Sequence, residues 1–509
     1  MRGLTKPDPA VLSQYHMAGR NMAKKELQHI VLLHSNDIHG DFAETDKDGL
    51  RTGGVSLLSG FIHRVRREEE HVIYAIAGDM FMGSIIDREY KGLSTIKIAN
   101  ALEPDVFEVG NHEVDYGLSH LLFLEKCAGF PIVCSNLYVK ELDRRLFFSY
   151  ADVIRGDVKI RFIGLLTESI ADRLRQEELI DSAVSVRPVA RELGRILEET
   201  AQDPADITIL LTHIGIEEDR LLAEHLDPAL HVDFIIGGHS HTFLNEPDMQ
   251  HGTPIVQAGF GSDQIGRFDL FWDKKCRKID HWSWELIPVN EETSEEDPLV
   301  SFYHDRFQTE TDRKYDRTLF TMPCEYTHPG FHKETQLSDL FADIYQDIFQ
   351  MDVFFLSTNV IWAKKLGPEV TRRDLMIAFP YENAVYELTM RGKRFIGLLE
   401  HLYKQEAWEG AHIFFLFSGT LQLTLTQEGK KPVEVLLRGE KIDPDQSITV
   451  GVTGYAYKNL ESFLGIGEQE MEKEITVRRR STDDRSAMEN YFEGIGRIEL
   501  KNEGRLRLV

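Results

Sequence analysis

Side chains that bind divalent metal ions recur at five places in the first half of the chain. Each place follows a short apolar run, as in IYAIAGD and ILLTH. The residues concerned are Asp37, His39, Asp79, Asn111, His112, Asp115, His213, His239 and His241. Imidazole, carboxylate and amide groups without thiolates suit Mn, Zn, Fe or Co, and they disfavour a structural zinc finger. The pattern therefore indicates a catalytic metal centre and not a structural one.

The number of these side chains indicates more than one ion. Seven of them are too many ligands for a single tetrahedral ion, namely Asp37, His39, Asp79, Asn111, His213, His239 and His241. Two divalent ions about 3.5–4 Å apart, bridged by one carboxylate, account for them better. Such a pair generates hydroxide at neutral pH and binds the oxygens of a phosphoryl group during in-line displacement. We therefore expect two divalent metal ions as cofactors.

The spacing of the ligands suggests how they converge. Residues i and i+2 of an extended segment point to the same side, so Asp37 with His39, and His239 with His241, are expected to reach one centre each. Glycines directly before Asp79, Asn111 and His239 permit sharp turns and close backbone approach. We expect loops at strand ends to present these side chains.

The elements that position the ligands are short apolar runs alternating with amphipathic stretches, from Ile30 to about Val289. This alternation predicts strands and helices in a layered α/β domain, where ligand sites gather at the carboxyl ends of the strands. The expected strands are Ile30–Leu33, Val72–Ala77, Asp105–Val109, Lys159–Leu166, Ile207–Leu211 and Val232–Ile236. The expected helices include Gly54–Arg67, Thr95–Leu102 and Val189–Thr200.

An acidic run, NEETSEED, interrupts this pattern and is followed by a charged helical stretch. A second pattern then begins, with an expected helix at Gln336–Phe349. We predict four segments: a flexible arm (1–28), a catalytic domain (29–290), a charged linker helix (291–318) and a C-terminal domain (319–509).

Composition narrows the function further. The 509 residues carry a net charge of −26, which argues against a nucleic acid polymer as partner because a polyanion requires a basic face. No apolar run approaches the roughly 18–20 residues of a membrane span. The four cysteines form no C-x-x-C pair, and the N-terminus lacks an apolar signal region, so we expect a cytoplasmic protein.

The segments SNDIHGDF, AGDMFMGS, GNHEVDYG and GGHSHT together resemble the motifs of the calcineurin-like metallophosphoesterases. The variant here is similar to the bacterial 5′-nucleotidase family, which includes UDP-sugar hydrolases. The resemblance implies an α/β fold, with an N-terminal β-sandwich flanked by helices and a C-terminal α/β domain of the 5′-nucleotidase type. It also implies hydrolysis of small phosphate esters, nucleotides above all, in nucleotide catabolism.

The resemblance assigns a role to each residue. It implies that one metal is held by Asp37, His39 and His241, and the other by Asn111, His213 and His239, with Asp79 bridging the two. It implies that His112 stabilises phosphoryl charge or protonates the leaving alkoxide, and that Asp115 orients its imidazole. The nucleophile implied is a metal-bound hydroxide.

The C-terminal domain resembles the part of the family that binds the nucleoside. Phe414, Tyr455 and Glu461 are the candidates for binding the base. The chain departs from the family in the loop that usually reads N-S-G-G-I-R, because it reads STNVIW and places Trp362 at the arginine. Tryptophan cannot make the bidentate phosphate contact of an arginine.

Alternatives to a nucleotidase therefore stay open. One is a phosphoesterase with broad or non-nucleotide specificity, acting on a cyclic nucleotide, a nucleotide sugar or another ester. The other is a metal-binding scaffold protein that has drifted from catalysis. The presence of His112 favours an enzyme, because a structural metal site has no use for a general acid.

Overall fold

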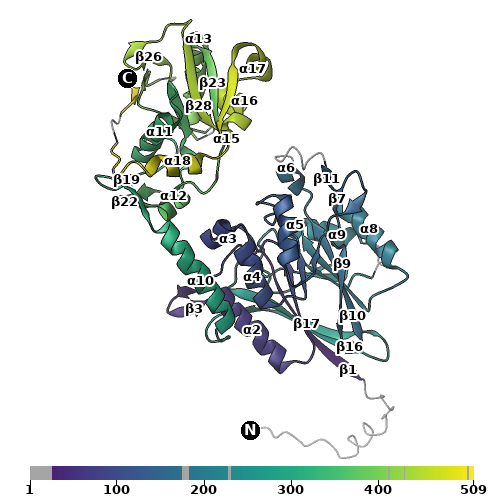
Figure 1. Cartoon of the computed structure of the whole chain (residues 1–509). Helices are drawn as coiled ribbons and strands as arrows, with labels where there is room; N and C mark the ends of the chain where they lie inside the picture. Colours follow the sequence, from purple (N-terminus) through teal and green to yellow (C-terminus); the bar gives the residue numbers. More distant parts are fainter. Residues whose placement is uncertain (1–25, 175–182, 227–230, 411–412, 429, 501–503) are drawn as a thin grey trace, which may run out of the picture. The chain divides into compact units, whose positions relative to one another are not determined.

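The protein is described by a computed structural model that covers residues 26–174, 183–226, 231–410, 413–428, 430–500 and 504–509. The chain divides into two compact units, residues 1–311 and 312–509 (Figure 1). The division falls within helix α10 (Pro298–Tyr315), inside the segment expected to connect two domains.

The N-terminal arm is shorter than expected. Residues 1–25 of the predicted arm lie outside the described residues. Strand β1 (Leu27–Ser35) begins before the predicted boundary, and its residues 27 and 28 pair with Asp273 and Trp272 of strand β16 (Gln264–Asp273). Backbone pairing to a neighbouring strand thus orders the last two residues of the segment expected to form a flexible arm.

The first unit contains two six-stranded sheets. The first has the order β17 (Lys278–Pro288), β16, β1, β4 (Val72–Ala77), β5 (Val106–Glu108) and β6 (Ile132–Val133). The second has the order β14 (Asp248–Gln250), β15 (Thr253–Val256), β13 (Phe234–Ile236), β12 (Ile207–His213), β10 (Val158–Leu166) and β9 (Tyr150–Arg155).

Alternating side chains of the central strands enter two different cores. Ile30 and Leu32 of β1 join Phe162 of β10 in the cluster between the sheets, whereas Val31 and Leu33 face the opposite way, into a helix-covered cluster. A strand buried on both faces reads as a continuous apolar run, which is why these strands could be located from the sequence. The expected layered α/β fold with an N-terminal β-sandwich is confirmed.

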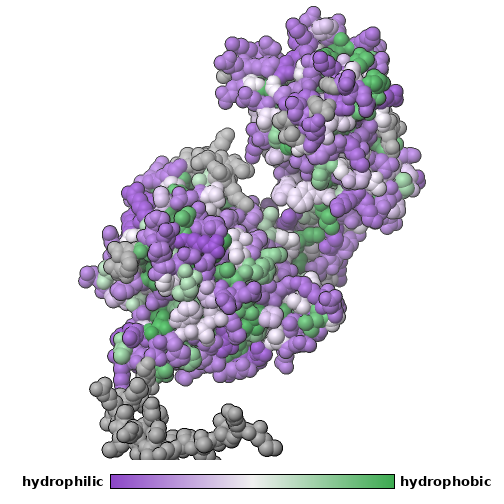
Figure 2. Space-filling model, turned by 180° about the vertical axis from the view of Figure 1, so that it is seen from behind, coloured by the Kyte–Doolittle hydropathy of each residue, from purple (hydrophilic) through white to green (hydrophobic). Residues whose placement is uncertain are grey.

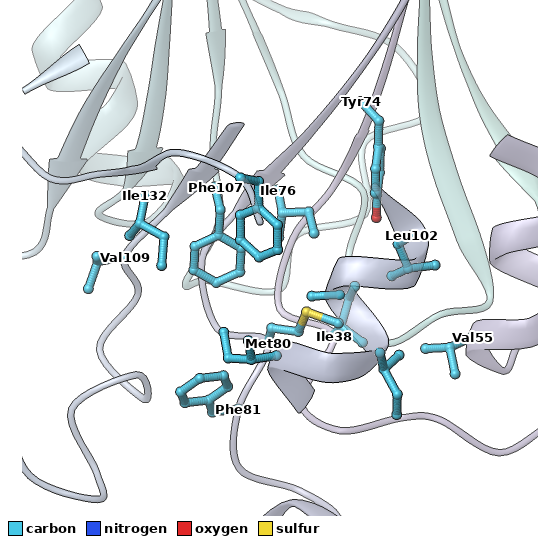
Figure 3. Close-up of a cluster of buried hydrophobic side chains, with 14 of the residues drawn as sticks. Ile38, Val55, Tyr74, Ile76, Met80, Phe81, Leu102, Phe107, Val109 and Ile132 are labelled. Carbon is cyan, nitrogen blue, oxygen red and sulfur yellow. The ribbon is translucent and has the colours of Figure 1, made fainter. Parts of the chain in front are cut away.

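Helices cover the outer face of each sheet. Helices α2 (Val55–Glu68), α4 (Leu93–Leu102) and α5 (Leu118–Cys127) pack on the first sheet, in the cluster shown in part in Figure 3. Helices α8 (Val189–Thr200) and α9 (Ile216–His225) pack on the second. The layers are therefore helix, sheet, sheet and helix.

Shorter elements complete this unit. They are β2 (Thr45–Lys47), β3 (Leu50–Thr52), α3 (Ile85–Tyr90), β7 (Leu137–Val139), β8 (Arg144–Arg145), α6 (Ile170–Leu174) and β11 (Val184–Val186).

Parallel strands form the centre of both sheets, because β1, β4, β5 and β6 run parallel, as do β10, β12, β13 and β15. In such sheets the carboxyl ends of the strands lie at one edge, where ligand sites form.

The second unit has a five-stranded and a four-stranded sheet. The first has the order β24 (Phe415–Phe417), β20 (Val353–Ser357), β28 (Ser447–Thr453), β23 (Val385–Arg391) and β29 (Thr476–Ser481), and the second β27 (Glu440–Lys441), β26 (Pro432–Leu437), β25 (Leu421–Leu425) and β30 (Leu506–Leu508). Two-stranded pairs join β18 (Thr318–Thr321) to β22 (Glu369–Thr371) and β19 (Tyr326–Thr327) to β21 (Lys365–Leu366).

Helices of the second unit pack against two apolar clusters. Helix α11 (Gln336–Phe349) spans the residues expected from the sequence, and the side chain of Thr335 caps its first turn. The others are η2 (Thr358–Val360), α12 (Arg372–Ala378), α13 (Gly392–Leu402), α14 (Gln405–Trp408), α15 (Gly454–Lys458), α16 (Leu460–Leu464), α17 (Glu468–Glu474) and α18 (Asp484–Phe492).

The face of the molecule shown in Figure 2 is mostly hydrophilic, with apolar residues scattered over both units. Among the described residues, no helix has the length and apolar character that crossing a membrane requires.

One carboxyl group is buried in the sandwich. Glu108 of β5 is fully buried, and neither of its carboxyl oxygens is hydrogen-bonded within the described part of the chain. It lies against Gly164 of β10, where an added Cβ would come within 1.8 Å of Oε2. Burial, with a smaller effect of the neighbouring Glu113, raises the pKa of Glu108 well above its ordinary value. Burial therefore favours the neutral, protonated form of the Glu108 carboxyl group.

This burial predicts a pH-dependent cost to stability. The folded-state pKa lies above the unfolded one, so the stabilising contribution is complete below the unfolded pKa and is lost as pH rises toward the folded pKa. Glu108→Leu removes this loss. The free energy of unfolding of Glu108→Leu minus that of wild type should therefore be larger at pH 7 than at pH 5, by at least about 1 kcal/mol.

Urea unfolding at the two pH values measures this difference. Glu198→Leu, at an exposed glutamate of α8, is the matched control and should leave the pH dependence of stability as in wild type. An identical pH dependence in Glu108→Leu and wild type would show that Glu108 is solvated or paired.

Candidate metal centre

The structure brings the seven predicted ligands together where strands of both sheets end. Asp37 and His39 follow β1, Asp79 follows β4, Asn111 follows β5, His213 ends β12, and His239 and His241 follow β13. Three overlapping groups have ligand atoms within 4.8 Å of one another: Asp37, His39 and His241; His39, Asp79 and His112; and Asp79, His213 and His239.

The first group consists of one carboxylate and two imidazoles, from Asp37, His39 and His241. The Nε2 atoms of His39 and His241 lie 2.9 Å apart. Asp37 Oδ1 lies 3.4 Å from His241 Nε2 and 3.9 Å from His39 Nε2. Asp37 and His39 are the only pair of these three that comes from one loop, so the group depends on the packing of the two sheets.

The other pole of the cluster is the group of Asp79, His213 and His239, joined by Asn111, and is called the second group from here on. It is centred on His213, whose side chain is fully buried. Its Nε2 lies 3.0 Å from Asp79 Oδ2 and 3.2 Å from Asn111 Oδ1, and its ring centroid is 5.2 Å from that of His239. Asp79 Oδ2 is also 3.7 Å from His39 Nε2 of the first group. Asp79 therefore lies between the two groups, the position that a bridging carboxylate requires.

The histidine rings are oriented as metal ligands are. His213 Nδ1 donates to the backbone oxygen of Ala77 at 2.8 Å, and His39 Nδ1 faces those of Phe81 and Met82 at 3.2 and 3.1 Å. Because carbonyl oxygens only accept, each ring proton lies on Nδ1 and the Nε2 lone pair faces the cluster. These donors fit divalent metal ions, which supports the expectation of a divalent metal cofactor.

The electrostatics of the cluster favour bound positive charge. Burial lowers the pKa of His39 and of His239, which keeps both rings neutral. Burial also lowers the pKa of His213, but Asp79 and Asp37 outweigh it and raise that pKa to about 10. Burial tends to raise the pKa of Asp79, yet His213, His112 and His39 hold it below its ordinary value. The two carboxylates thus attract a cation here, whether a proton or a metal.

The backbone that presents these ligands is not extended, contrary to the i, i+2 argument. Five ligand residues have φ in the left-handed region: Asp37 (51°), His39 (50°), Asp79 (53°), His239 (76°) and His241 (54°). Non-glycine residues rarely adopt such values, each at a cost on the order of 1–3 kcal/mol, and they cluster at functional sites. The ligands do converge as pairs, but tight turns direct them and not an extended strand.

Glu113 organises the loops behind the ligands, a role that sequence reasoning missed. Its buried carboxylate accepts backbone N–H groups of Asp79 (2.9 Å), Met80 (2.8 Å), Phe81 (3.3 Å) and Gly110 (2.6 Å). Burial and the nearby Asp79 raise its pKa to about 7. The glutamate in the motif GNHEVDYG was the available signal, because a buried acid in a glycine turn needs backbone donors.

Asn36 has a comparable role for the first group. Its side-chain amide donates to Asp37 Oδ2 and to the backbone oxygen of Gly259 at 2.7 Å, while its Oδ1 accepts from the N–H of Ala258 at 2.8 Å. The residue next to a ligand thus connects β1 to the loop that follows β15. Its position beside Asp37 in SNDIHGDF was the only sequence signal.

The predicted acid–base pair is formed. His112 Nδ1 lies 2.5 Å from Asp115 Oδ2, and the backbone N–H of His112 donates to Asp79 Oδ1 at 2.8 Å. The ring of His112 meets that of His39 edge to face at 5.1 Å. With Nδ1 committed to Asp115, Nε2 is the atom that can reach a substrate oxygen.

The candidates for base binding lie in the second unit and do not form a stacking site. Phe414 is 1% exposed, because it packs in the core against Tyr403 and Trp408, with ring centroids 5.9 and 5.0 Å away. This burial corrects its expected role, since a core ring cannot stack on a base. Tyr455 is exposed and contacts Phe463 at 5.4 Å, and Glu461 is exposed at the start of α16.

The position of Asp79 predicts coupled loss of metal and activity. In Asp79→Ala the carboxylate shared by the two groups is gone, so we expect the bound metal to fall from two ions per chain to one or none, and turnover to fall with it. Elemental analysis of the metal-loaded, desalted chain measures this.

The control is Asp115→Ala, which should retain metal because Asp115 belongs to none of the three groups. Two ions per chain in Asp79→Ala would contradict the bridging assignment.

Comparison with known proteins agrees with this geometry. The family model of the calcineurin-like phosphoesterases matches residues 30–243, and that of the 5′-nucleotidase C-terminal domain matches residues 321–465. The matches fall one in each unit. Together they span all seven predicted metal ligands, part of the sandwich and most of the second unit.

Several relatives match most of the chain. A 5′-nucleotidase of Vibrio vulnificus (strain CMCP6) is 26% identical over 485 residues, and the protein UshA of Escherichia coli (strain K12) is 25% identical over 484 residues; each alignment covers 84% of both chains. A bovine 5′-nucleotidase is 30% identical over 279 residues, which are 48% of this chain and 47% of the relative.

Solved structures share the fold over nearly the whole chain. A 5′-nucleotidase precursor of Thermus thermophilus has a TM-score of 0.62 at 20% identity, covering 95% of this chain and 99% of that one. A 5′-nucleotidase of Candida albicans has a TM-score of 0.56 at 16% identity, covering 91% and 98%. The two matched domains, their order and the full-length relatives show that the chain belongs to the 5′-nucleotidase family of metal-dependent phosphate-ester hydrolases.

Proposed function

We propose that this enzyme hydrolyses nucleotides or related small phosphate esters with two divalent metal ions bound at the sandwich edge. The observation that carries the proposal is the pair of ligand groups on either side of Asp79, which receive side chains from five strand ends. Mn, Zn, Fe and Co all suit these donors. The scaffold alternative is disfavoured because the His112–Asp115 pair is assembled beside the ligands.

The roles of the chain's own residues follow from their contacts. Two bound ions would supply an activated water and positive charge around the phosphoryl group. Asp115 accepts a hydrogen bond from Nδ1–H of His112, which orients the ring and stabilises its doubly protonated, imidazolium form. From Nε2–H the imidazolium then protonates the leaving oxygen, which leaves His112 neutral, or donates a hydrogen bond to a phosphoryl oxygen. Asp79 holds the backbone N–H of His112 and thereby ties this acid to the metal ligands.

Nucleotides are the first choice of substrate because relatives that match most of the chain, such as that of Vibrio vulnificus, are named 5′-nucleotidases. One observation favours a second candidate, a phosphoesterase of broader or non-nucleotide specificity. Trp362 stands where the family usually has an arginine, is 58% exposed, and contacts Tyr381. Phe414, one of the three candidates for binding the base, is buried.

The cellular location stays a prediction. We propose a cytoplasmic location, which rests on the cysteine usage of the sequence. Cell fractionation tests it, and a protein found outside the cytoplasm would contradict it.

Hydrolysis of a substrate panel, with the products separated by chromatography, tests the proposed function. Metal-stripped protein is supplied with Mn²⁺ or Zn²⁺ and offered nucleoside monophosphates, a nucleotide sugar, a cyclic nucleotide and p-nitrophenyl phosphate. Turnover concentrated on nucleotides supports a nucleotidase, and turnover of the aryl ester alone supports the broader phosphoesterase. Two bound ions without any turnover would favour the scaffold and overturn the proposal.

His112 provides a second test of the mechanism. His112→Ala should lower kcat about a hundredfold or more on an ester with a poor leaving group, because the leaving oxygen must then depart unprotonated. The loss should be smaller on p-nitrophenyl phosphate, whose leaving group needs no proton. His120→Ala, at a histidine that contacts the backbone oxygen of Lys91, is the control. Near-normal turnover of a nucleoside monophosphate by His112→Ala would reject the role.

A further inference from the structure

Two exposed phenylalanines stand beside the first ligand group. Phe260 is 51% exposed, and its ring stacks on that of His241 with centroids 5.3 Å apart and planes inclined by 28°. Phe243 is 50% exposed and meets Phe260 edge to face at 5.8 Å. Large apolar rings are exposed at a cost, so an adjacent pair at a catalytic rim requires an explanation.

The loop that carries Phe260 is tied to the metal centre on both sides. Gly261 N–H donates to the backbone oxygen of Asp37 at 2.8 Å, and Ser262 donates through N–H and Oγ to Asp41, both at 2.9 Å. On the other side, Asn36 contacts Ala258 and Gly259 as described above. The ring of Phe260 is thus held in place by the residues that hold Asp37.

Phe243 is fixed by packing on the backbone. The segment around it bridges to the Phe260 loop, because Phe243 pairs with Ala258 and the N–H of Gly259 donates to the oxygen of Thr242 at 3.0 Å. Gly259 has a φ of 79°, and a Cβ there would lie 2.3 Å from the Phe243 ring. Neither ring can fold into the core, so both remain at the surface next to His241.

A rigid, exposed aromatic ring is suited to stacking on another planar ring. Stacking between an aromatic side chain and a base contributes about 1–3 kcal/mol and tolerates different rings, since each has a π-face. A row of rings leads from the acid to this surface: His112, His39, His241 and Phe260, with successive centroids 5.1, 4.9 and 5.3 Å apart. A substrate with its phosphate at the ligands can therefore extend an organic group along this row.

We propose that Phe260 and Phe243 form an aromatic subsite that stacks on a planar ring of the substrate, a nucleobase or an aryl group, at the rim of the metal centre. This rests on the proposed function for the phosphate position. The subsite lies wholly within the first unit, so it selects ring-bearing esters without any residue of the second. It offers the enzyme an aromatic contact that the buried Phe414 does not.

Calorimetric titration of the full chain loaded with Mn²⁺ tests the subsite without depending on turnover. The ligands are 3-phenylpropylphosphonate and propylphosphonate, which differ only in the ring. Wild type should bind the first more tightly. Phe260→Ala and Phe243→Ala should each weaken binding of the phenyl compound about tenfold, and leave Kd for propylphosphonate within about twofold.

Matched variants separate stacking from damage to the site. Phe123→Ala removes an equally exposed phenylalanine of the same unit (52% exposed, on α5) and should change neither Kd. Phe260→Tyr keeps the ring and should bind as wild type does. Equal weakening of both phosphonates would show that Phe260 only supports His241, and unchanged binding of both would show that the rings serve another surface; either result overturns the proposal.

Turnover distinguishes the two sources of the ring. A higher KM of Phe260→Ala for adenosine 5′-monophosphate, without a change for ribose 5-phosphate, identifies a nucleobase. A higher KM for phenyl phosphate alone identifies an aryl ester. If wild type hydrolyses none of these while the phosphonates still distinguish the variants, the proposed function fails and the subsite stands.

Discussion

A single layer of apolar side chains joins the two sheets of the first unit, and the metal centre depends on it. Three of the ligand-bearing loops follow strands of the first sheet, and the other two follow strands of the second. Asp37 reaches His241, and Asp79 reaches His213, only because the sheets meet face to face through residues such as Leu32 and Phe162. A one-residue slip of a ligand-bearing strand within its sheet would turn the apolar side chains of that strand out of this layer. Packing in the core therefore sets the distances at the surface.

The sandwich could be predicted from the sequence because its central strands are buried on both faces and so read as continuous apolar runs. The ligands could be predicted because each follows such a run. The backbone turns could not, since the left-handed conformations at Asp37 and His241 are imposed by contacts between loops far apart in the sequence. The role of Glu113 was missed for the same reason, because its partners lie in a different loop as well as its own.

The second unit was harder to predict in function than in fold. Helix α11 lies where the sequence placed it. Phe414 was expected at a binding surface because of the resemblance to the family, and the sequence alone does not distinguish which aromatic of this segment faces the core. Contacts with Tyr403 and Trp408 place Phe414 in the core. The exposure of the Trp362 and Tyr381 rings likewise depends on tertiary packing.

The four backbone donors gathered by Glu113 have a consequence for how ions enter and leave. Protein groups, and not the ions, hold the turns at Asp79 and Gly110 and orient the rings of His39 and His213. Because these contacts hold the ligand side chains in position without metal, the loops lose little order when the ions dissociate. Ions of similar size can then exchange without refolding of the loops, and the fixed geometry of the ligands, together with the supply of each ion, selects the metal.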